Sequence, residues 1–313
     1  MGAAKATGTL QPMGDNGSEL CVLSVHAHPD DEASKGASTM ARYASEGVRT
    51  VLVCCTGGEA GDILNEEADS PEARADIGAV RMRELAESVR IIGYHELYLL
   101  GYRDSGMPDT EHNAHPDNFA NADLDEAVGR LVRIIRIEEP QVLISYPDAR
   151  GGGYAHPDHI RVHDISVLAF DRAGDPDWYP DAGTPFQPLK LYFSGGFSRE
   201  RVTKMHEYFT SRGEESPFAE WIERMNKEEE TRPETTTTRI DIGDFMHIGR
   251  EALLAHRTQV APTGFFFRVP PEVTREIHPF EDFVLERSLV DTGVAHGEFE
   301  HDLFQGIRVT TGS

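Results

Sequence analysis

The stretch "LCVLSVHAHPDDEASKG", residues 20–36, is the most informative part of the sequence, because an apolar run passes directly into imidazole and carboxylate side chains. The apolar run predicts a buried strand, Pro29 marks its exit, and a helix is predicted over roughly 34–46. Polar groups at the end of a buried strand are unfavourable unless they have partners. A metal ion would be such a partner, so we expect a functional site here.

The same alternation of apolar runs and helical patterns continues to about residue 170. Near-continuous apolar strands separated by helices predict an α/β fold, with a doubly wound, mostly parallel, Rossmann-like sheet and helices on both faces. In such sheets ligands bind beyond the carboxyl ends of the strands, where this chain places its polar loops. The further strands and helices are expected, in chain order, at 49–56, 72–93, 95–100, 123–140 and 141–146.

We expect a disordered leader at 1–19 and one domain over 20–313. Its core α/β sheet is expected at 20–170, and 171–313 is expected to add the remaining sheet and an irregular C-terminal cap that covers the substrate. The parts of this second section are a loop over the site at 171–188, a strand at 189–196, a polar helix at 216–230, an exposed linker at 231–239 and an amphipathic segment at 240–260.

The composition excludes several classes of partner. A formal charge of −24 argues against nucleic acid and anionic membranes, and no run approaches the roughly 18 apolar residues of a membrane span. Cys21, Cys54 and Cys55 fall in predicted strands, which indicates buried thiols rather than a disulfide framework or a zinc site. We therefore expect a cytoplasmic protein that acts on a small molecule.

A second polar cluster, "GYAHPDHIRVH", follows the fourth predicted strand. Taken with the first cluster, it offers His28, Asp31 and His159 as a His₂–carboxylate set with an open position for water, a pattern typical of catalytic zinc. His163 lies one helical turn beyond His159, so it is either a rival ligand or an ordinary helix histidine. For Asp30 and Asp31 the plainer alternative is capping of the following helix.

"AHPDDE" with the downstream "HPDH" resembles the metal motifs of the LmbE-like deacetylase family, zinc hydrolases that remove acyl groups from amino sugars. The resemblance runs from about residue 20 to 307. It implies one zinc ion per chain on His28, Asp31 and His159, although such a set also suits Fe²⁺. It also implies Asp30 as the general base, which agrees with the position of a carboxylate beside an activated water molecule.

The resemblance implies roles for further residues. His156 would stabilise the oxyanion as a cation, with Asp158 holding its ring. Tyr154 would support the same oxyanion. The plainer alternative for Tyr154 is an aromatic side chain of a loop without a catalytic role. For Lys35 and Arg81 the plainer alternative is a solvated charge on the surface. Substrate contacts are implied for Lys35, Arg81 and Asp104.

The stretches "DEASKG", "TGGEAGDILN", "LLAHRTQVAPTGFFFRVP" and "EHDLFQGI" resemble the branch of the family that acts on conjugated thiols. The implied activity is hydrolysis of the amide between glucosaminyl-inositol and the acylated cysteine of mycothiol S-conjugates. This reaction would release a mercapturic acid and detoxify thiol conjugates in an actinobacterial cytoplasm. Aromatic loops at 171–188 and 261–271 are expected to hold the S-substituent.

Three alternatives stay open for the function. Two keep the chemistry: deacetylation of N-acetylglucosaminyl-inositol in mycothiol biosynthesis, and hydrolysis of a thiol-bearing natural product intermediate. The third is a metal-dependent sugar-binding protein without turnover. Asp30 and His156 argue against it, because binding alone needs neither a base nor an acid. A nicotinamide enzyme is excluded, since no GxGxxG motif follows the first strand.

Overall fold

The computed structural model describes residues 19–150, 155–195, 198–228, 236–264 and 267–308. Across these residues a seven-stranded sheet runs in the order β3-β2-β1-β4-β5-β7-β6. Its strands are β1 (Cys21–His26), β2 (Arg49–Thr56), β3 (Glu96–Tyr102), β4 (Val142–Ser145), β5 (Lys190–Ser194), β6 (Thr238–Asp241) and β7 (Phe280–Ser288).

Five neighbouring strands, from β3 to β5, are parallel, whereas β7 runs antiparallel to both β5 and β6. The predicted α/β class with a mostly parallel sheet is confirmed. The sequence did not predict β6, because its residues were divided between the linker and the amphipathic segment. Their partners lie on β7, with Thr238 opposite Phe283 and Asp241 opposite Phe280, so the pairing has no local signature.

Two predicted helices are each divided in two. The first breaks at Gly36, whose left-handed backbone (φ 105°) favours glycine. The second breaks at Asp76, whose side chain accepts a hydrogen bond from the backbone of Ala79 and so caps a new helix. The described helices are α1 (Asp31–Ser34), α2 (Ala37–Ser45), α3 (Pro71–Ala75), α4 (Ile77–Ile92), α5 (Leu124–Glu138), α6 (Pro157–Arg172), α7 (Arg199–Thr210), α8 (Ala219–Glu228), α9 (Met246–Ala255) and α10 (Pro271–Ile277).

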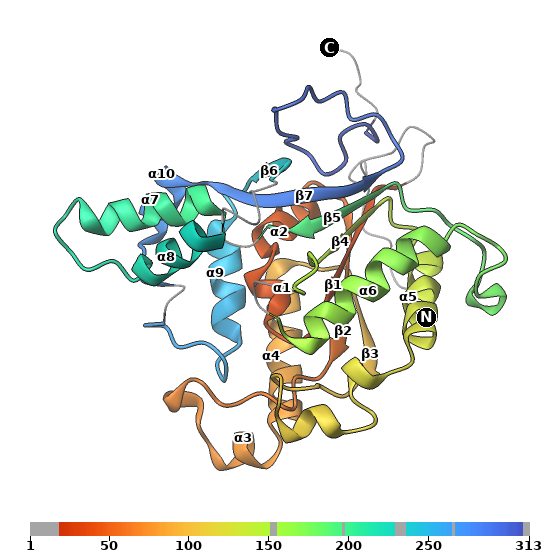
Figure 1. Cartoon of the computed structure of the whole chain (residues 1–313), viewed down its shortest axis with the longest axis horizontal. Coiled ribbons are helices and arrows are strands. Elements are labelled where there is room, and N and C mark those ends of the chain that lie inside the picture. The colour runs from red at the N-terminus through yellow and green to blue at the C-terminus, as the bar shows by residue number, and fades with distance from the viewer. Residues whose placement is uncertain (1–18, 151–154, 196–197, 229–235, 265–266, 309–313) are drawn as a thin grey trace, which may run out of the picture.

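Helices cover both faces of the sheet, as Figure 1 shows. Alternate side chains of β1 serve the two faces: Leu23 and Val25 pack in the core under α5 and α6, while Val22 packs with Met40 and Tyr43 of α2. Beyond α9, the helices α7, α8 and α10 enclose a smaller apolar cluster. The sheet is therefore buried on both sides, and its polar groups gather at the strand ends.

The segment 171–188 does not cover the site, so that prediction is wrong. Because α6 joins the parallel strands β4 and β5, it must return the chain to the amino end of the sheet, away from the site. There Arg136, near the end of α5, holds the segment by donating to the carbonyl oxygens of Ala173, Asp175, Trp178 and Tyr179.

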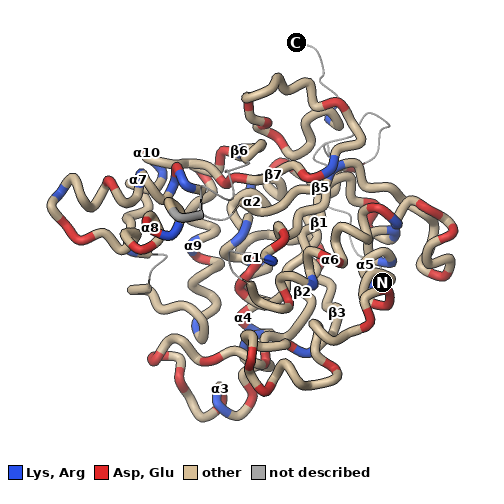
Figure 2. The backbone as a smooth tube through the Cα atoms, in the orientation of Figure 1, with Lys and Arg blue, Asp and Glu red and all other residues tan. Residues whose placement is uncertain are grey.

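Charge is distributed over the molecule. Figure 2 shows Asp and Glu residues on loops and helices in every part of the view. Among the residues that the structure describes, no helix is both long and apolar enough to cross a membrane.

Candidate active site

The two histidine-rich stretches meet because β1 and β4 are hydrogen-bonded neighbours in the sheet. The first stretch leaves β1 and enters α1. The second forms the N-terminus of α6, where His156 is the cap residue and Pro157 the first helical residue. The Nδ1 atom of His156 accepts a hydrogen bond from the backbone nitrogen of Asp158 at 3.2 Å. Both stretches therefore end at the carboxyl edge of the sheet, where a ligand site was expected.

His28, Asp31 and His159 form a compact set of donor atoms. Asp31 Oδ2 lies 3.4 Å from His28 Nδ1 and 3.3 Å from His159 Nε2. All three side chains are buried, and one ligand atom from each lies within 4.8 Å of the others. A buried carboxylate facing two imidazoles fits a divalent metal such as zinc or iron. The structure thus brings the predicted trio together, and its role as a ligand set stays a prediction.

His28 is oriented from its other side by two carboxylates. Its Nε2 lies 3.1 Å from Asp158 Oδ2 and 3.5 Å from Asp104 Oδ1. A histidine that ligates a metal commonly donates its second N–H to a carboxylate, which fixes the ring. The contacts leave Nδ1 of His28 directed at Asp31, as a metal ligand requires.

Asp158 makes contacts that differ from the expected ones. Its carboxylate accepts hydrogen bonds from the backbone nitrogen, at 3.0 Å, and the hydroxyl of Ser105, in addition to contacting His28. Burial, followed by the charge of His28, lowers the pKa of His156 to about 4. A neutral ring is therefore favoured, and the imidazolium expected from the sequence stays a prediction. In the neutral ring Nδ1 accepts a backbone N–H, so the ring proton is on Nε2.

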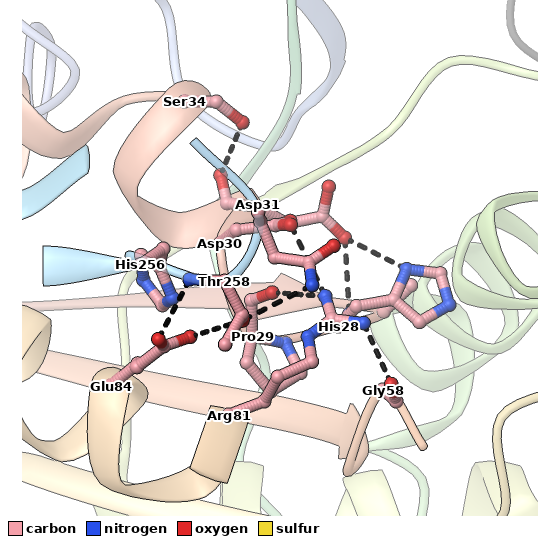
Figure 3. A network of polar contacts seen from close by, with 12 residues as sticks. His28, Pro29, Asp30, Asp31, Ser34, Gly58, Arg81, Glu84, His256 and Thr258 are labelled. Atoms are coloured by element: carbon pink, nitrogen blue, oxygen red, sulfur yellow. Dashed lines mark hydrogen bonds and ion pairs between the residues drawn. The ribbon is translucent and has the colours of Figure 1, made fainter. Parts of the chain in front are cut away.

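Asp30 faces Arg81 (Figure 3). Its Oδ2 lies 3.1 Å from Arg81 Nη2, and its backbone is left-handed, with φ 108°. Although Asp30 occupies the cap position of α1, its side chain makes no capping hydrogen bond there. Burial raises the pKa of the Asp30 carboxyl, and Arg81 opposes that shift. The carboxylate is therefore held beside the trio by Arg81, and its role as the general base stays a prediction.

Arg81 is buried, with only 4% of its surface exposed, so the plain surface interpretation is wrong. It donates to the carbonyl oxygens of Pro29 at 2.6 Å and Gly58 at 2.7 Å. A Cβ atom on Gly58 or on Gly61 would clash with Nη1 of Arg81. The glycines of "TGGEAG" thus admit the guanidinium, which ties the loops after β1 and β2 together.

Comparison with known proteins identifies the family. Residues 23–170 match PIG-L, described as GlcNAc-PI de-N-acetylase. Mycothiol S-conjugate amidase of Streptomyces coelicolor is 44% identical over 295 residues, 93% of this chain and 98% of that protein. The chain belongs to the PIG-L (LmbE-like) family. It is accordingly an enzyme, a hydrolase that acts on amide C–N bonds.

Two other proteins resemble this PIG-L family member. The 1D-myo-inositol 2-acetamido-2-deoxy-alpha-D-glucopyranoside deacetylase of Thermobifida fusca is 38% identical over 270 residues, 84% of this chain and 92% of that protein. The N,N'-diacetylchitobiose deacetylase of Pyrococcus horikoshii has a TM-score of 0.58 at 19% identity, covering 85% of this chain and 84% of that structure. The second likeness concerns the fold alone.

Of the remaining predicted site residues, the structure places Lys35 at the site and His163 outside it. Lys35 is at the site, since its ammonium contacts Asp31 Oδ1 and donates to Ser34 Oγ at 3.2 Å. Although burial would raise the pKa of Asp31, Lys35 and His159 hold it well below its usual range. His163 is outside the trio, because its Nδ1 donates to the carbonyl oxygen of Tyr146 at 3.0 Å. Tyr154 lies outside the described residues.

Glu32 and His256 are buried residues that the sequence analysis missed. Glu32 Oε1 lies 2.6 Å from His256 Nε2 and accepts from Ser88, while Oε2 accepts from the backbone nitrogen of Asp30 at 2.9 Å. Burial alone would raise the pKa of Glu32 and lower that of His256, but the attraction between them reverses both shifts. This ion pair fixes the left-handed turn that carries Asp30.

Replacing Arg81 with methionine should destabilise this PIG-L family member by roughly 2–4 kcal/mol, because Asp30 and two carbonyl oxygens lose their donor. Without the opposing guanidinium, the pKa of Asp30 should rise further, so the acid limb of the pH–rate profile should move to higher pH. Urea unfolding and kcat/KM against pH measure the two effects. Arg83→Met, on the exposed side of α4, is the control and should change neither.

Replacing Glu32 with glutamine should destabilise the fold most at mildly acidic pH. Folding raises the pKa of His256, so the ion pair contributes fully below about pH 6.5 and its contribution is lost as the pH rises through the folded value. We expect a loss of about 3 kcal/mol at pH 5.5 and about 1 kcal/mol at pH 9. Urea unfolding at both pH values, with exposed Glu223→Gln as the control, measures this. Equal losses at both would contradict an ion pair.

Proposed function

We propose that this enzyme hydrolyses the amide between glucosaminyl-inositol and the acylated cysteine of mycothiol S-conjugates, using one zinc ion per chain. The observation that carries the proposal is a buried His28–Asp31–His159 set with Asp30 beside it, in a chain 44% identical to a mycothiol S-conjugate amidase. Cys21, Cys54 and Cys55 are buried free thiols. Their state supports a reducing cytoplasm as the location.

The reaction follows from the placement of the side chains. A zinc ion in the trio would lower the pKa of a water molecule and polarise the amide carbonyl. Asp30 would accept the proton of the attacking water, because Arg81 holds its carboxylate in place at 3.1 Å and opposes the rise of its pKa that burial causes. The Nε2–H of neutral His156 donates to the oxyanion that develops on the carbonyl oxygen. Asp30, once protonated, returns the proton to the leaving amine.

The cleft over the trio suits the sugar side of this substrate. It has a volume of about 380 Å³, and the side chains of Asp62, Arg81, Asp104 and Gln259 reach its lining. A mixture of hydrogen-bond donors and acceptors of this kind matches a polyhydroxylated ring. We assign Asp104 and Arg81 to the glucosaminyl-inositol side and Lys35 to the amide itself, because Lys35 already contacts Asp31 of the trio.

The test is an amine-release assay on the metal-replete protein. A mycothiol S-conjugate and N-acetylglucosaminyl-inositol are offered in parallel, and kcat/KM is measured for each. We expect the conjugate to be preferred by at least about tenfold, because its larger acyl group provides more binding energy to the transition state. A preference for the acetyl sugar would assign the enzyme to deacetylation instead, an alternative that the 38% identity to an inositol-glucosamine deacetylase keeps in view.

A further inference from the structure

Tyr146 is a buried residue beside the trio that the proposed mechanism does not use. It directly follows β4, at the carboxyl edge of the sheet, and only 3% of its surface is exposed. It does not line the cleft, so it does not reach a substrate. Burial raises the pKa of its hydroxyl well above the usual range, which makes proton transfer by Tyr146 unfavourable at neutral pH. Any role of Tyr146 must therefore act through its neighbours.

The ring of Tyr146 packs on the imidazole of His159. The two ring centres lie 4.6 Å apart and the ring planes are inclined by only 28°, which is a stacked arrangement. An imidazole ring can turn broadly about its last side-chain bond, and each turn moves Nε2. Because the stacked tyrosine restricts that motion, Nε2 of His159 stays directed at Asp31 Oδ2, 3.3 Å away.

The hydroxyl of the same tyrosine contacts the end of β1. It accepts a hydrogen bond from the backbone nitrogen of Ala27 at 3.2 Å and lies 2.9 Å from Nδ1 of His26. Ala27 directly precedes His28 in the chain. His26 is a firm anchor, since it lies within β1 and only 1% of its surface is exposed. The hydroxyl thereby holds the backbone from which His28 and Asp31 project.

The predicted ligands come from two separate elements, and Tyr146 contacts both. His28 and Asp31 lie where β1 passes into α1, whereas His159 is on α6. A metal site binds tightly when its ligands are held in their final geometry before the ion arrives. Residues behind the ligands supply that order, and replacing one commonly costs about 10- to 100-fold in metal affinity.

We propose that Tyr146 is a positioning residue of the metal site, which sets the placement of the ligand on α6 relative to the two ligands after β1. Its ring orients His159, and its hydroxyl fixes the end of β1 ahead of His28. Lys35, which we assign to the amide, lies over the same ring with Nζ 5.7 Å from its centre. This inference rests on the proposed function, because it takes His28, Asp31 and His159 as the zinc ligands.

The experiment compares zinc affinity in two variants of Tyr146. Competition with a chelator measures the affinity of the full-length protein, and urea unfolding shows whether each variant is folded. Tyr146→Phe keeps the stacked ring and removes the hydroxyl, so we expect a loss of about tenfold in zinc affinity. Tyr146→Leu removes both contacts, and we expect a loss of about 100-fold. Affinities of both variants within about twofold of the unmodified protein would overturn the proposal.

The visible spectrum of bound Co²⁺ reports the arrangement of the ligands independently of turnover. It should change in Tyr146→Leu. Tyr192→Phe is the matched control, because the Tyr192 hydroxyl is also buried and donates to Glu300 Oε2 at 2.7 Å, on the face of the sheet that α2 covers. The control should lose stability and keep both its zinc affinity and its cobalt spectrum. An equal loss of zinc affinity in Tyr192→Phe would assign the effect to general destabilisation and overturn the proposal.

His26→Phe tests the hydroxyl contact from its other side, and it decides the question if Tyr146→Leu fails to fold. Zinc affinity should fall by several-fold, because the hydroxyl loses one of its partners. The double variant His26→Phe/Tyr146→Phe should lose no more than Tyr146→Phe alone, since both changes remove the same contact. Fully additive losses would show that His26 and Tyr146 act separately and would refute positioning through β1.

Amine release from a mycothiol S-conjugate separates this inference from the proposed function. A protein that hydrolyses the conjugate, with zinc affinity unchanged in both Tyr146 variants, would retain the function and refute the positioning role. A protein that binds zinc and loses affinity in both variants, but releases no amine, would retain the positioning role and refute the amidase function.

Discussion

Replacing Asp30 with alanine should lower kcat for amide hydrolysis by about 10²- to 10⁴-fold, the usual contribution of a general base. The bound metal should stay at about one ion per chain. The reason is the geometry of the turn: Asp31 faces His28 and His159, whereas Asp30 faces Arg81. Adjacent carboxylates therefore face different groups, and only Asp31 belongs to the proposed ligand set.

The measurement combines turnover with metal content. Asp171→Ala removes an exposed carboxylate at the far end of α6 and should leave both unchanged. Loss of metal together with activity would make Asp30 a ligand. Turnover within tenfold of the unmodified enzyme would remove it as the base.

The trio could be predicted because its sequence motifs are local and because the same strand–helix pattern recurs along the chain. Each histidine-rich stretch follows an apolar strand, and parallel strands deliver their carboxyl ends to the same edge of a sheet. The residues around His28 and His159 were therefore sufficient to predict that the two side chains lie close together. The parallel strands themselves were equally visible, since β2 occupies the same residues, Arg49–Thr56, as the apolar run that predicted it.

The surroundings of the trio could not be predicted, because their contacts join distant parts of the chain. Glu32 and His256 are separated by 224 positions, and nothing near either residue indicates the other. Arg81 sits on a helix whose pattern fits a surface charge, yet the glycines at 58 and 61 open a space for it. Burial of a charge depends on which loop crosses above it, and hydrophobic periodicity carries no such information.

The errors in the structure predicted for the chain after residue 170 have a similar cause. The strand β6 is short and polar at its ends, so it is stabilised by its ladder to β7 rather than by its own residues. The aromatic content of 171–188 suggested a substrate loop. Arg136 instead gathers the segment's carbonyl oxygens at the amino edge of the sheet. The composition of the segment predicted a substrate-binding loop, but the topology of the sheet places the segment at the edge opposite the site.

Replacing His159 with alanine should abolish tight metal binding and, with it, turnover. Asp31 and His28 would remain, but two ligands three positions apart in one turn cannot enclose a metal from both sides. We expect the metal affinity to fall by more than about 100-fold, the upper end of what removal of a supporting hydrogen bond produces around a metal site. Zinc content after dialysis against buffers of graded free zinc measures the affinity.

The chain provides a matched control on the same helix. His163, one turn beyond His159, is the rival ligand, and its ring is instead engaged with the carbonyl oxygen of Tyr146 and packed against Phe193. His163→Ala should therefore keep its metal and its activity while losing about 1 kcal/mol of stability with that hydrogen bond. If both variants lost the metal equally, α6 would supply two ligands and the set would be closed, leaving no position for water. Retention in His163→Ala alone keeps the open position that a hydrolase needs, since the fourth site must admit both the attacking water and the amide carbonyl.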